Sequence, residues 1–193
     1  LKRLRFDSLC LQAVCLEIQT LLGQPCQGVE SLGSMGISLQ FWSGKPTWVN
    51  LRAHPDGLGA WLSSRSERQE RTPWVTTIRK HLLNTTLVAV KQVQGDRIVD
   101  LELAGPEGTF ILTAELLGKH GNLVLRAPDD RCLAAARWVG PSRSDRPLLP
   151  GKPYERPPAP TGRAPFLDAL ENLLGASELE RRLANITSRA YSV

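Results

Sequence analysis

The sequence lacks a long hydrophobic run. None of its apolar stretches approaches the roughly 18 residues that a membrane-spanning helix requires, so we expect no contact with a membrane. Histidine is scarce, with three residues, and no two of the four cysteines have C-x-x-C spacing, so neither a metal site nor a cofactor is expected. Cys10 and Cys15 fall in a predicted helix, where buried, reduced thiols and therefore a reducing, cytoplasmic compartment are expected.

The motifs that mark common enzyme classes are missing as well. Neither G-x-x-x-x-G-K-[ST] nor G-x-G-x-x-G occurs, so the usual phosphate-binding loops are absent. G-x-S-x-G and H-E-x-x-H do not occur either, and no spacing unites Ser, His and Asp into a triad. Motif search therefore identifies no enzyme.

The composition is that of a globular protein. With 193 residues, 41% hydrophobic and 22% charged, the chain has room for one domain and a small appendage. A net charge of +5 suits a polyanionic partner and equally an ordinary basic protein. The chain opens without Met or a signal peptide and stops within a helical pattern, so we expect it to be the N-terminal piece of a longer protein.

Periodicity predicts an α+β fold, an antiparallel β-sandwich with flanking helices. The first helix carries apolar residues from Leu9 to Leu22, is capped by Asp7 or Ser8, and ends at a left-handed Gly23. Residues 54–65 are expected to form a short helical turn, and Thr72 is expected to cap a second helix over 73–84. Strands are predicted over 36–42, 47–53, 86–93, 97–104, 109–116, 122–127 and 131–139.

Proline becomes frequent from Gly140 to Pro165, which favours an extended linker. We place the domain boundary in this segment, with a first domain over 1–158. Residues 159–193 are predicted to form a linker and the start of a truncated helical domain, from "PFLDALENLLG" and "SELERRLANITSRA".

Three polar clusters admit a functional interpretation beside a structural one. Asp96-Arg97 in "QGDRI" fits the end of a hairpin, where an ion pair at the surface stabilises the fold by about 0–1 kcal/mol. The alternative is a pair that contacts a phosphate or a base, and the residues alone favour the structural interpretation. Arg79 and Lys80 in "IRKHL" fit a solvated helix face or an RNA-contacting one.

The third cluster is "ELLGKHGN", residues 115–122, which lies between two predicted strands. It has more polar side chains than a tight hairpin needs. Gly118 and Gly121 permit close approaches of the backbone, and Lys119 is a flexible cation, so the loop is able to approach a phosphate backbone.

Taken together, these motifs resemble the NFACT family. "DSLCLQAV", "RKHL", "QGDRIV", "ELLGKHGN" and "LLPGKPYERPP" occur in that family's order, over roughly residues 6–158. The resemblance implies a ribosome-associated quality-control factor, some relatives of which are called fibronectin-binding proteins. Such factors bind the large ribosomal subunit with its stalled peptidyl-tRNA, and recruit charged tRNA, alanyl in bacteria, for template-free tailing.

The same resemblance assigns residues and a fold. Binding of tRNA is implied for Asp96, Arg97, Glu115, Leu116 and Leu117, and a supporting RNA or ribosome surface for Lys119, His120, Asn122, Arg79 and Lys80. We expect Glu115 to orient Lys119 or Arg97. The implied fold is similar to the N-terminal domain of formamidopyrimidine DNA glycosylases.

The sequence departs from the family pattern at two positions of the third cluster. Leu117 stands where the family usually has Met, and Gly121 where it usually has Ser; we expect this glycine to loosen the loop. The alternative functions are a DNA-binding or DNA-repair glycosylase-like protein and a fibronectin-binding surface protein.

Overall fold

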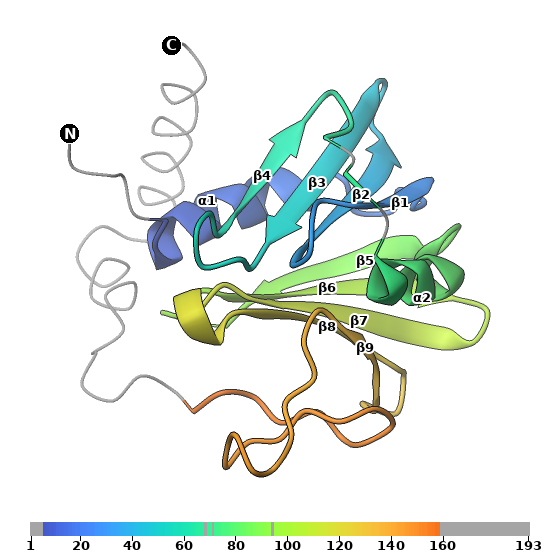
Figure 1. Cartoon of the computed structure of the whole chain (residues 1–193). Helices are drawn as coiled ribbons and strands as arrows, with labels where there is room; N and C mark the ends of the chain where they lie inside the picture. Colours follow the sequence, from blue (N-terminus) through green and yellow to red (C-terminus); the bar gives the residue numbers. More distant parts are fainter. Residues whose placement is uncertain (1–5, 68, 71, 94, 159–193) are drawn as a thin grey trace, which may run out of the picture.

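The computed structural model describes residues 6–67, 69–70, 72–93 and 95–158, and the predicted helices after residue 159 lie outside this range. The described residues form two antiparallel sheets stacked face to face (Figure 1). The first sheet consists of β1 (Gly28–Ser31), β2 (Gly36–Trp42), β3 (Pro46–Arg52) and β4 (Gly59–Ser63). The second consists of β5 (Thr86–Gln92), β6 (Ile98–Gly105), β7 (Gly108–Glu115), β8 (Asn122–Arg126) and β9 (Cys132–Ala135). The α+β sandwich predicted from the sequence is confirmed.

Helices α1 (Ser8–Gln19) and α2 (Pro73–Leu82) flank the sandwich. The first packs against the edge strands β4 and β5, and the second against β1 and β9, so each covers one open side between the sheets. The space between the sheets is the main core, which includes Phe41, Leu51 and Leu101, all fully buried. None of the described helices is both long and apolar enough to cross a membrane.

The predicted start of α1 is confirmed. Asp7 is the N-cap, and its carboxylate accepts a hydrogen bond of 2.9 Å from the backbone N–H of Cys10. The helix ends at Gln19, and Gly23 then adopts the expected left-handed conformation, with φ of +82°. Cys15 is buried as predicted, and burial raises the pKa of its thiol to about 12, whereas Cys10 is exposed. The expectation of a buried thiol is therefore wrong for Cys10, because two residues five positions apart lie on different faces of a helix.

The second helix and the first sheet agree with the prediction only in part. Thr72 is the N-cap of α2, but its hydroxyl makes no capping hydrogen bond. The β2–β3 hairpin is confirmed, with Leu39 opposite Val49. The helical turn expected over residues 54–65 is wrong, because β4 forms there and pairs with β3. Strand β1 was not predicted. Both are short edge strands, so little local periodicity marks them, and pairing with a neighbouring strand determines their conformation.

The proline-rich segment packs on the outer face of the second sheet, as Figure 1 shows in orange below β8 and β9. We call its described part, residues 139–158, the C-terminal strap. Val139 and Leu148 exchange backbone hydrogen bonds of 3.0 and 2.8 Å, and Cys132 donates one of 2.8 Å to Lys152. Leu148 and Tyr154 form a second hydrophobic cluster with residues of β8 and β9. This part of the expected linker is therefore integrated into the domain through isolated bridges, which proline tolerates.

Candidate nucleic-acid interface

The polar clusters "QGDRI" and "ELLGKHGN" meet at one end of the second sheet. Strand β6 begins there just after Arg97, and β7 ends there at Glu115, which pairs with Ile98. The backbone N–H of Leu116 donates a hydrogen bond of 2.8 Å to the carbonyl oxygen of Arg97. The two clusters are therefore neighbours, because consecutive antiparallel strands bring the start of one beside the end of the next.

Asp96 and Arg97 lie in the turn between β5 and β6, and both are half-buried. One carboxylate oxygen of Asp96 accepts a hydrogen bond of 2.7 Å from the backbone N–H of Arg97, and Gln92 donates one of 2.8 Å to the Asp96 carbonyl. Among described residues, the Arg97 guanidinium makes a single long hydrogen bond, 3.4 Å to the carbonyl of Phe6. The turn is thus held by its backbone, and most of the five guanidinium donors have no partner among the described residues.

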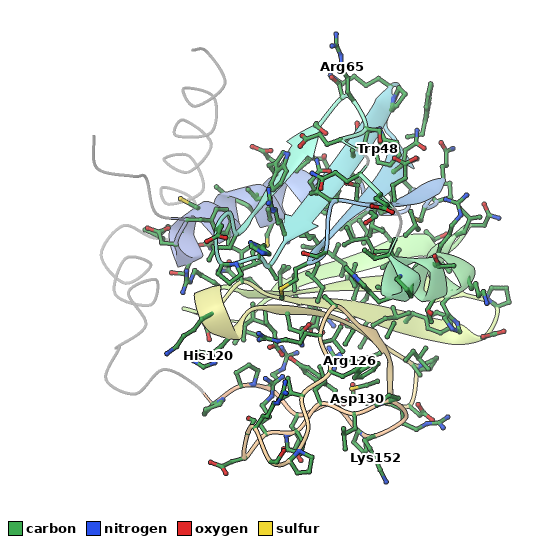
Figure 2. All side chains as sticks on the ribbon, in the orientation of Figure 1. Trp48, Arg65, His120, Arg126, Asp130 and Lys152 are labelled. Atoms are coloured by element: carbon green, nitrogen blue, oxygen red, sulfur yellow. The ribbon has the colours of Figure 1, made fainter. Side chains whose placement is uncertain are left out.

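The loop after β7 contains a single helical turn, η1 (Gly118–His120). Gly118 has a φ of +67°, in the left-handed region that glycine adopts without strain. The turn closes with a hydrogen bond of 2.9 Å from the N–H of Gly121 to the carbonyl of Gly118. Lys119 and His120 are exposed, and Figure 2 shows His120 projecting outward from this turn.

Glu115 does not orient Lys119 or Arg97, contrary to the sequence-based expectation. Its carboxylate is 1% exposed and accepts a hydrogen bond of 2.7 Å from the hydroxyl of Tyr154. It also forms an ion pair with the guanidinium of Arg146. Both partners belong to the C-terminal strap, far along the chain, so no local pattern indicates this contact.

Leu116 and Asn122 also have structural environments. Leu116 is fully buried in the main core, so its side chain is not exposed to a partner in this structure. The side-chain NH2 of the buried Asn122 donates a hydrogen bond of 2.7 Å to the backbone carbonyl of Arg137. Its side-chain oxygen accepts a hydrogen bond of 3.1 Å from the backbone N–H of Arg137. Asn122 therefore fixes the backbone that follows β9. Leu117 is half-buried.

A polar pocket of about 300 Å³ lies beside η1. It is lined by Glu115, Lys119, His120, Asn122, Arg137, Trp138, Val139, Arg143, Ser144, Arg146 and Leu148. Sequence reasoning did not single out the residues after β9, which supply most of the positive charge. "RWVGPSR" does combine cations with an aromatic ring, but its position next to η1 follows only from the tertiary fold.

The cations of this pocket differ in their pairing. Arg146 is neutralised by Glu115, whereas none of the ion pairs among the described residues includes Lys119, Arg137 or Arg143. Arg137 does donate hydrogen bonds of 3.3 Å to the backbone carbonyls of Lys119 and Gly121, which attach it to the η1 loop. The pocket therefore has an excess of positive charge, as a polyanion-binding surface requires.

A family model for NFACT N-terminal and middle domains matches residues 7–191 of the chain. The chain belongs to the NFACT family. Among curated relatives, the Rqc2 homolog RqcH of Streptococcus pneumoniae is 27% identical over 172 residues, which cover 83% of this chain and 31% of that protein. The archaeal Rqc2 homolog aRqcH of Methanocaldococcus jannaschii is 33% identical over 84 residues, 42% of this chain and 12% of that protein. The chain thus spans about a third or less of these relatives.

Solved structures show the same fold. The N-terminal domain of the fibronectin-binding protein PavA from Streptococcus pneumoniae has a TM-score of 0.74 at 25% identity, covering 98% of this chain and 83% of that one. The N-terminal part of the fibronectin/fibrinogen-binding protein from Streptococcus suis also has a TM-score of 0.74, at 24% identity, covering 89% and 70%.

Gly121, where the NFACT pattern usually has Ser, occupies a closely packed position in the loop. It is buried with an ordinary φ of −59°. A Cβ added there would lie 2.6 Å from the carbonyl oxygen of Ala53 and 3.0 Å from that of Gly118. The glycine therefore permits a close approach between the loop and the first sheet, which a side chain would obstruct.

Arg79 and Lys80 of the NFACT "RKHL" motif lie apart from the other predicted site residues. Arg79 donates a hydrogen bond of 3.0 Å to the carbonyl of Val29, and Lys80 is exposed. The ring of the adjacent His81 packs 5.2 Å from that of Phe110, near the start of β7. Figure 1 shows α2 and η1 at opposite ends of the sandwich, so the structure does not unite these cations with the η1 loop.

The C-terminal strap covers a charged network on the second sheet, which Figure 2 shows around Arg126 and Asp130. Arg126 pairs with Asp100 at 2.9 Å and with Asp130 at 2.6 Å, and Arg156 also pairs with Asp100. The Arg126 guanidinium lies 4.7 Å from the centre of the Tyr154 ring. Burial, followed by the nearby Glu115 carboxylate, raises the pKa of Tyr154 above its ordinary value.

No group of three or more potential metal ligands occurs among the described residues. The tRNA-binding and ribosome-binding roles of the residues named above stay predictions.

Proposed function

We propose that this chain is the tRNA- and ribosome-binding part of a ribosome-associated quality-control factor. It binds the large subunit carrying a stalled peptidyl-tRNA and recruits tRNA, charged with alanine, for template-free tailing of the nascent chain. The observation that carries the proposal is the position of Asp96-Arg97 beside the η1 loop in an NFACT chain. A cytoplasmic location is part of the same proposal.

In this proposal Arg97 and Asp96 read nucleotides by complementary chemistry. The planar guanidinium of Arg97 suits the two acceptors of a phosphate or of a guanine edge. The second carboxylate oxygen of Asp96 makes no hydrogen bond to another described residue and is available to an amino or imino donor on a base. Because a carboxylate repels phosphate, Asp96 confers preference for a base edge rather than general affinity.

Glu115 and Leu116 contribute through position. Their buried side chains fix the end of β7 and hence the path of the η1 loop, where Lys119 and His120 face solvent. No bond-making step is assigned to this chain; peptidyl transfer belongs to the ribosome, and the protein positions the tRNA.

Binding of alanyl-tRNA tests the proposal. We expect the double variant Asp96→Ala with Arg97→Ala to bind at least about tenfold more weakly by fluorescence anisotropy, because a specific base and phosphate contact is lost. Its melting temperature should fall by only about 2–4 °C, since the turn keeps its backbone hydrogen bonds. Arg65→Ala, which removes a cation from the loop after β4, is the matched control. Unchanged tRNA affinity in the double variant would refute the site.

Ribosome association needs its own measurement. We expect the chain to sediment with large subunits that carry peptidyl-tRNA and less with empty subunits. Sequencing of the RNA that co-purifies with the full-length protein should show tRNA enriched over the double variant. Equal recovery of all RNA classes from both proteins would contradict selective recruitment.

Fibronectin binding is a second candidate, supported by the names of the solved relatives at 24% and 25% identity. Surface labelling of intact cells tests it, because an adhesin has to be accessible outside the cell. The similarity of the sandwich to formamidopyrimidine DNA glycosylases also stays a prediction. A nicking assay on duplex DNA with oxidised guanine tests whether such an activity exists.

A further inference from the structure

The pocket beside η1 has the features of a built binding site. The side-chain NH2 and oxygen of Asn122 both form hydrogen bonds with the Arg137 backbone. The Arg137 guanidinium in turn donates hydrogen bonds to two backbone carbonyls of the η1 loop. The walls contributed by the loop and by the residues after β9 are therefore tied to each other. Arg143, from the C-terminal strap, is exposed on the third side.

The electrostatics of the pocket favour an anion. Lys119, Arg137 and Arg143 have no acidic partner among the described residues, so no described carboxylate neutralises their charge. The carboxylate of Glu115 also lines the pocket, but it is 1% exposed, paired with Arg146 and hydrogen-bonded to Tyr154. Its negative charge is thus compensated before any ligand arrives.

An aromatic ring lies among these cations. Trp138 is 37% exposed, although it follows a strand whose other apolar side chains are mostly covered. Indole rings stack on nucleobases, and stacking is open only to bases that are not already enclosed in a duplex. An acidic peptide would use the cations but would leave the ring without a planar partner.

We propose that this pocket binds one unpaired RNA nucleotide, with its base stacked on Trp138 and its phosphate between Lys119 and Arg143. The inference rests on the proposed function and extends it, because it adds a second contact point beyond Asp96-Arg97. From β6 to β9 the second sheet spans three strand intervals, about 14 Å at the usual spacing. A short single-stranded segment of RNA spans that distance, so one strand is able to reach both points along the end of the sheet.

The test uses the 193-residue chain with a fluorescent ten-nucleotide RNA without secondary structure, and with tRNA. We expect Trp138→Ala to weaken binding of the single strand by about tenfold, within the range for loss of one stacked base. Trp138→Phe keeps a stacking surface and should remain within about twofold of wild type. Equal affinities of the Ala and Phe variants for the single strand would overturn the proposal. An equal loss of affinity of Trp138→Ala for single-stranded and duplex RNA would overturn it as well.

The cation is tested by its salt dependence. Arg143→Ala should weaken binding several-fold and lower the slope of log affinity against log salt by about one, as expected for one lost phosphate contact. Arg65→Ala removes the same charge and should leave the slope unchanged; Figure 2 shows Arg65 at the top of the first sheet and His120 at the lower left, beside the second sheet. Identical slopes for the two arginine variants would overturn the phosphate contact.

Tryptophan fluorescence provides a readout that does not depend on affinity. The RNA should quench the emission of wild type more than that of Trp138→Phe, whereas Trp42→Phe, which removes another exposed indole, should be quenched like wild type. Melting curves of all variants verify folding. Because the side chains of Trp42 and Trp138 are both exposed, only small changes in melting temperature are expected.

The outcomes separate this inference from the proposed function. If Asp96→Ala with Arg97→Ala loses tRNA while Trp138→Ala and Arg143→Ala bind normally, the proposed function stands and the pocket is not an RNA site. If wild type binds neither RNA, both fail. If an acidic peptide binds with dependence on Arg143 while RNA does not, the pocket is a peptide site and this inference is wrong.

Discussion

The outer face of the second sheet and the end of that sheet use the same residue types in opposite ways. On the outer face, Arg126 and Arg146 are each paired with a buried carboxylate under the C-terminal strap. At the end of the sheet, Lys119, Arg137 and Arg143 have no such partner within the described residues. Paired charges connect the strap to the sheet, whereas unpaired charges near the surface remain available to an external anion.

Glu115 connects the two regions. It is the last residue of β7, it lines the pocket, and yet its carboxylate is committed to Arg146 and Tyr154. Glu115, although it belongs to a motif that the NFACT resemblance singles out, is therefore able to act by holding the fold. The comparison predicts large effects on stability from the outer face and effects on RNA binding from the end of the sheet.

The largest effect is expected from Arg126→Ala. The variant leaves Asp130 without its partner, and it leaves Asp100, at 4% exposure, with only Arg156 and the Thr113 hydroxyl. Breaking a buried pair from one side typically costs about 3–5 kcal/mol, so the free energy of unfolding measured in urea should fall by that amount. Arg143→Ala is the matched control and should change it by less than about 0.5 kcal/mol. Similar losses for both arginines would remove the distinction.

Tyr154→Phe should cost about 1.5–3 kcal/mol, because the hydroxyl donates to a charged, buried carboxylate. The pKa of Tyr154 is raised in the folded state from an ordinary value of 10.0, so its proton is held where the unfolded chain loses it. This contribution is complete below about pH 10 and is lost as the pH rises further. Between about pH 9 and pH 11 the free energy of unfolding, measured in urea, should therefore decrease less for the variant than for wild type. Parallel pH profiles would contradict the buried environment of the ring.

Gly121→Ser should destabilise the chain by about 1–3 kcal/mol, as overpacking does, because the new Cβ meets the Ala53 carbonyl. Gly140→Ser is the control, since a Cβ there has no neighbour within 4 Å. Because the loop carries Lys119, RNA affinity should fall together with stability in the first variant only. A Gly121→Ser protein as stable as wild type would show that the loop moves aside at little cost.

Lys119→Ala and Lys80→Ala should give the smallest effects, and they sharpen the comparison by position. Both lysines are exposed, so each substitution should leave the melting temperature nearly unchanged. Lys119→Ala should weaken binding of tRNA by a few-fold, with a reduced salt slope, and Lys80→Ala should weaken it less. An equal loss from Lys80→Ala would mean that the cations of α2 form part of the interface, despite their place at the other end of the sandwich.

Much of the fold was predictable from local patterns. Asp7 before an apolar helical repeat indicated the start of α1, and the alternation in "GISLQFW" indicated β2. The short strand β4 was not predictable, because its conformation depends on pairing with β3. The proline content of the strap predicts a linker, and its packing was not predictable for the same reason: bridges such as that of Val139 with Leu148 join residues that no periodicity relates.

The candidate site was predictable as a set of motifs but not as an arrangement. The proximity of Asp96-Arg97 to the η1 loop follows from strand order, and the structure confirms it. The burial of Glu115 and the presence of Arg137 and Trp138 beside Lys119 were missed. These contacts join residues that are far apart in the chain, and the spacing of residues in the sequence does not predict such contacts.

The sequence by itself determined the helix starts, the hairpins, the α+β class and the order of motifs, because each depends on the conformational preferences of neighbouring residues. The tertiary structure alone decided which charges are neutralised, since Glu115 and Arg146 meet only after the C-terminal strap packs on the second sheet. Coulombic pairing depends on distance and burial in space. The same residue types therefore hold the fold on one face, whereas at the end of the sheet they have no acidic partner among the described residues.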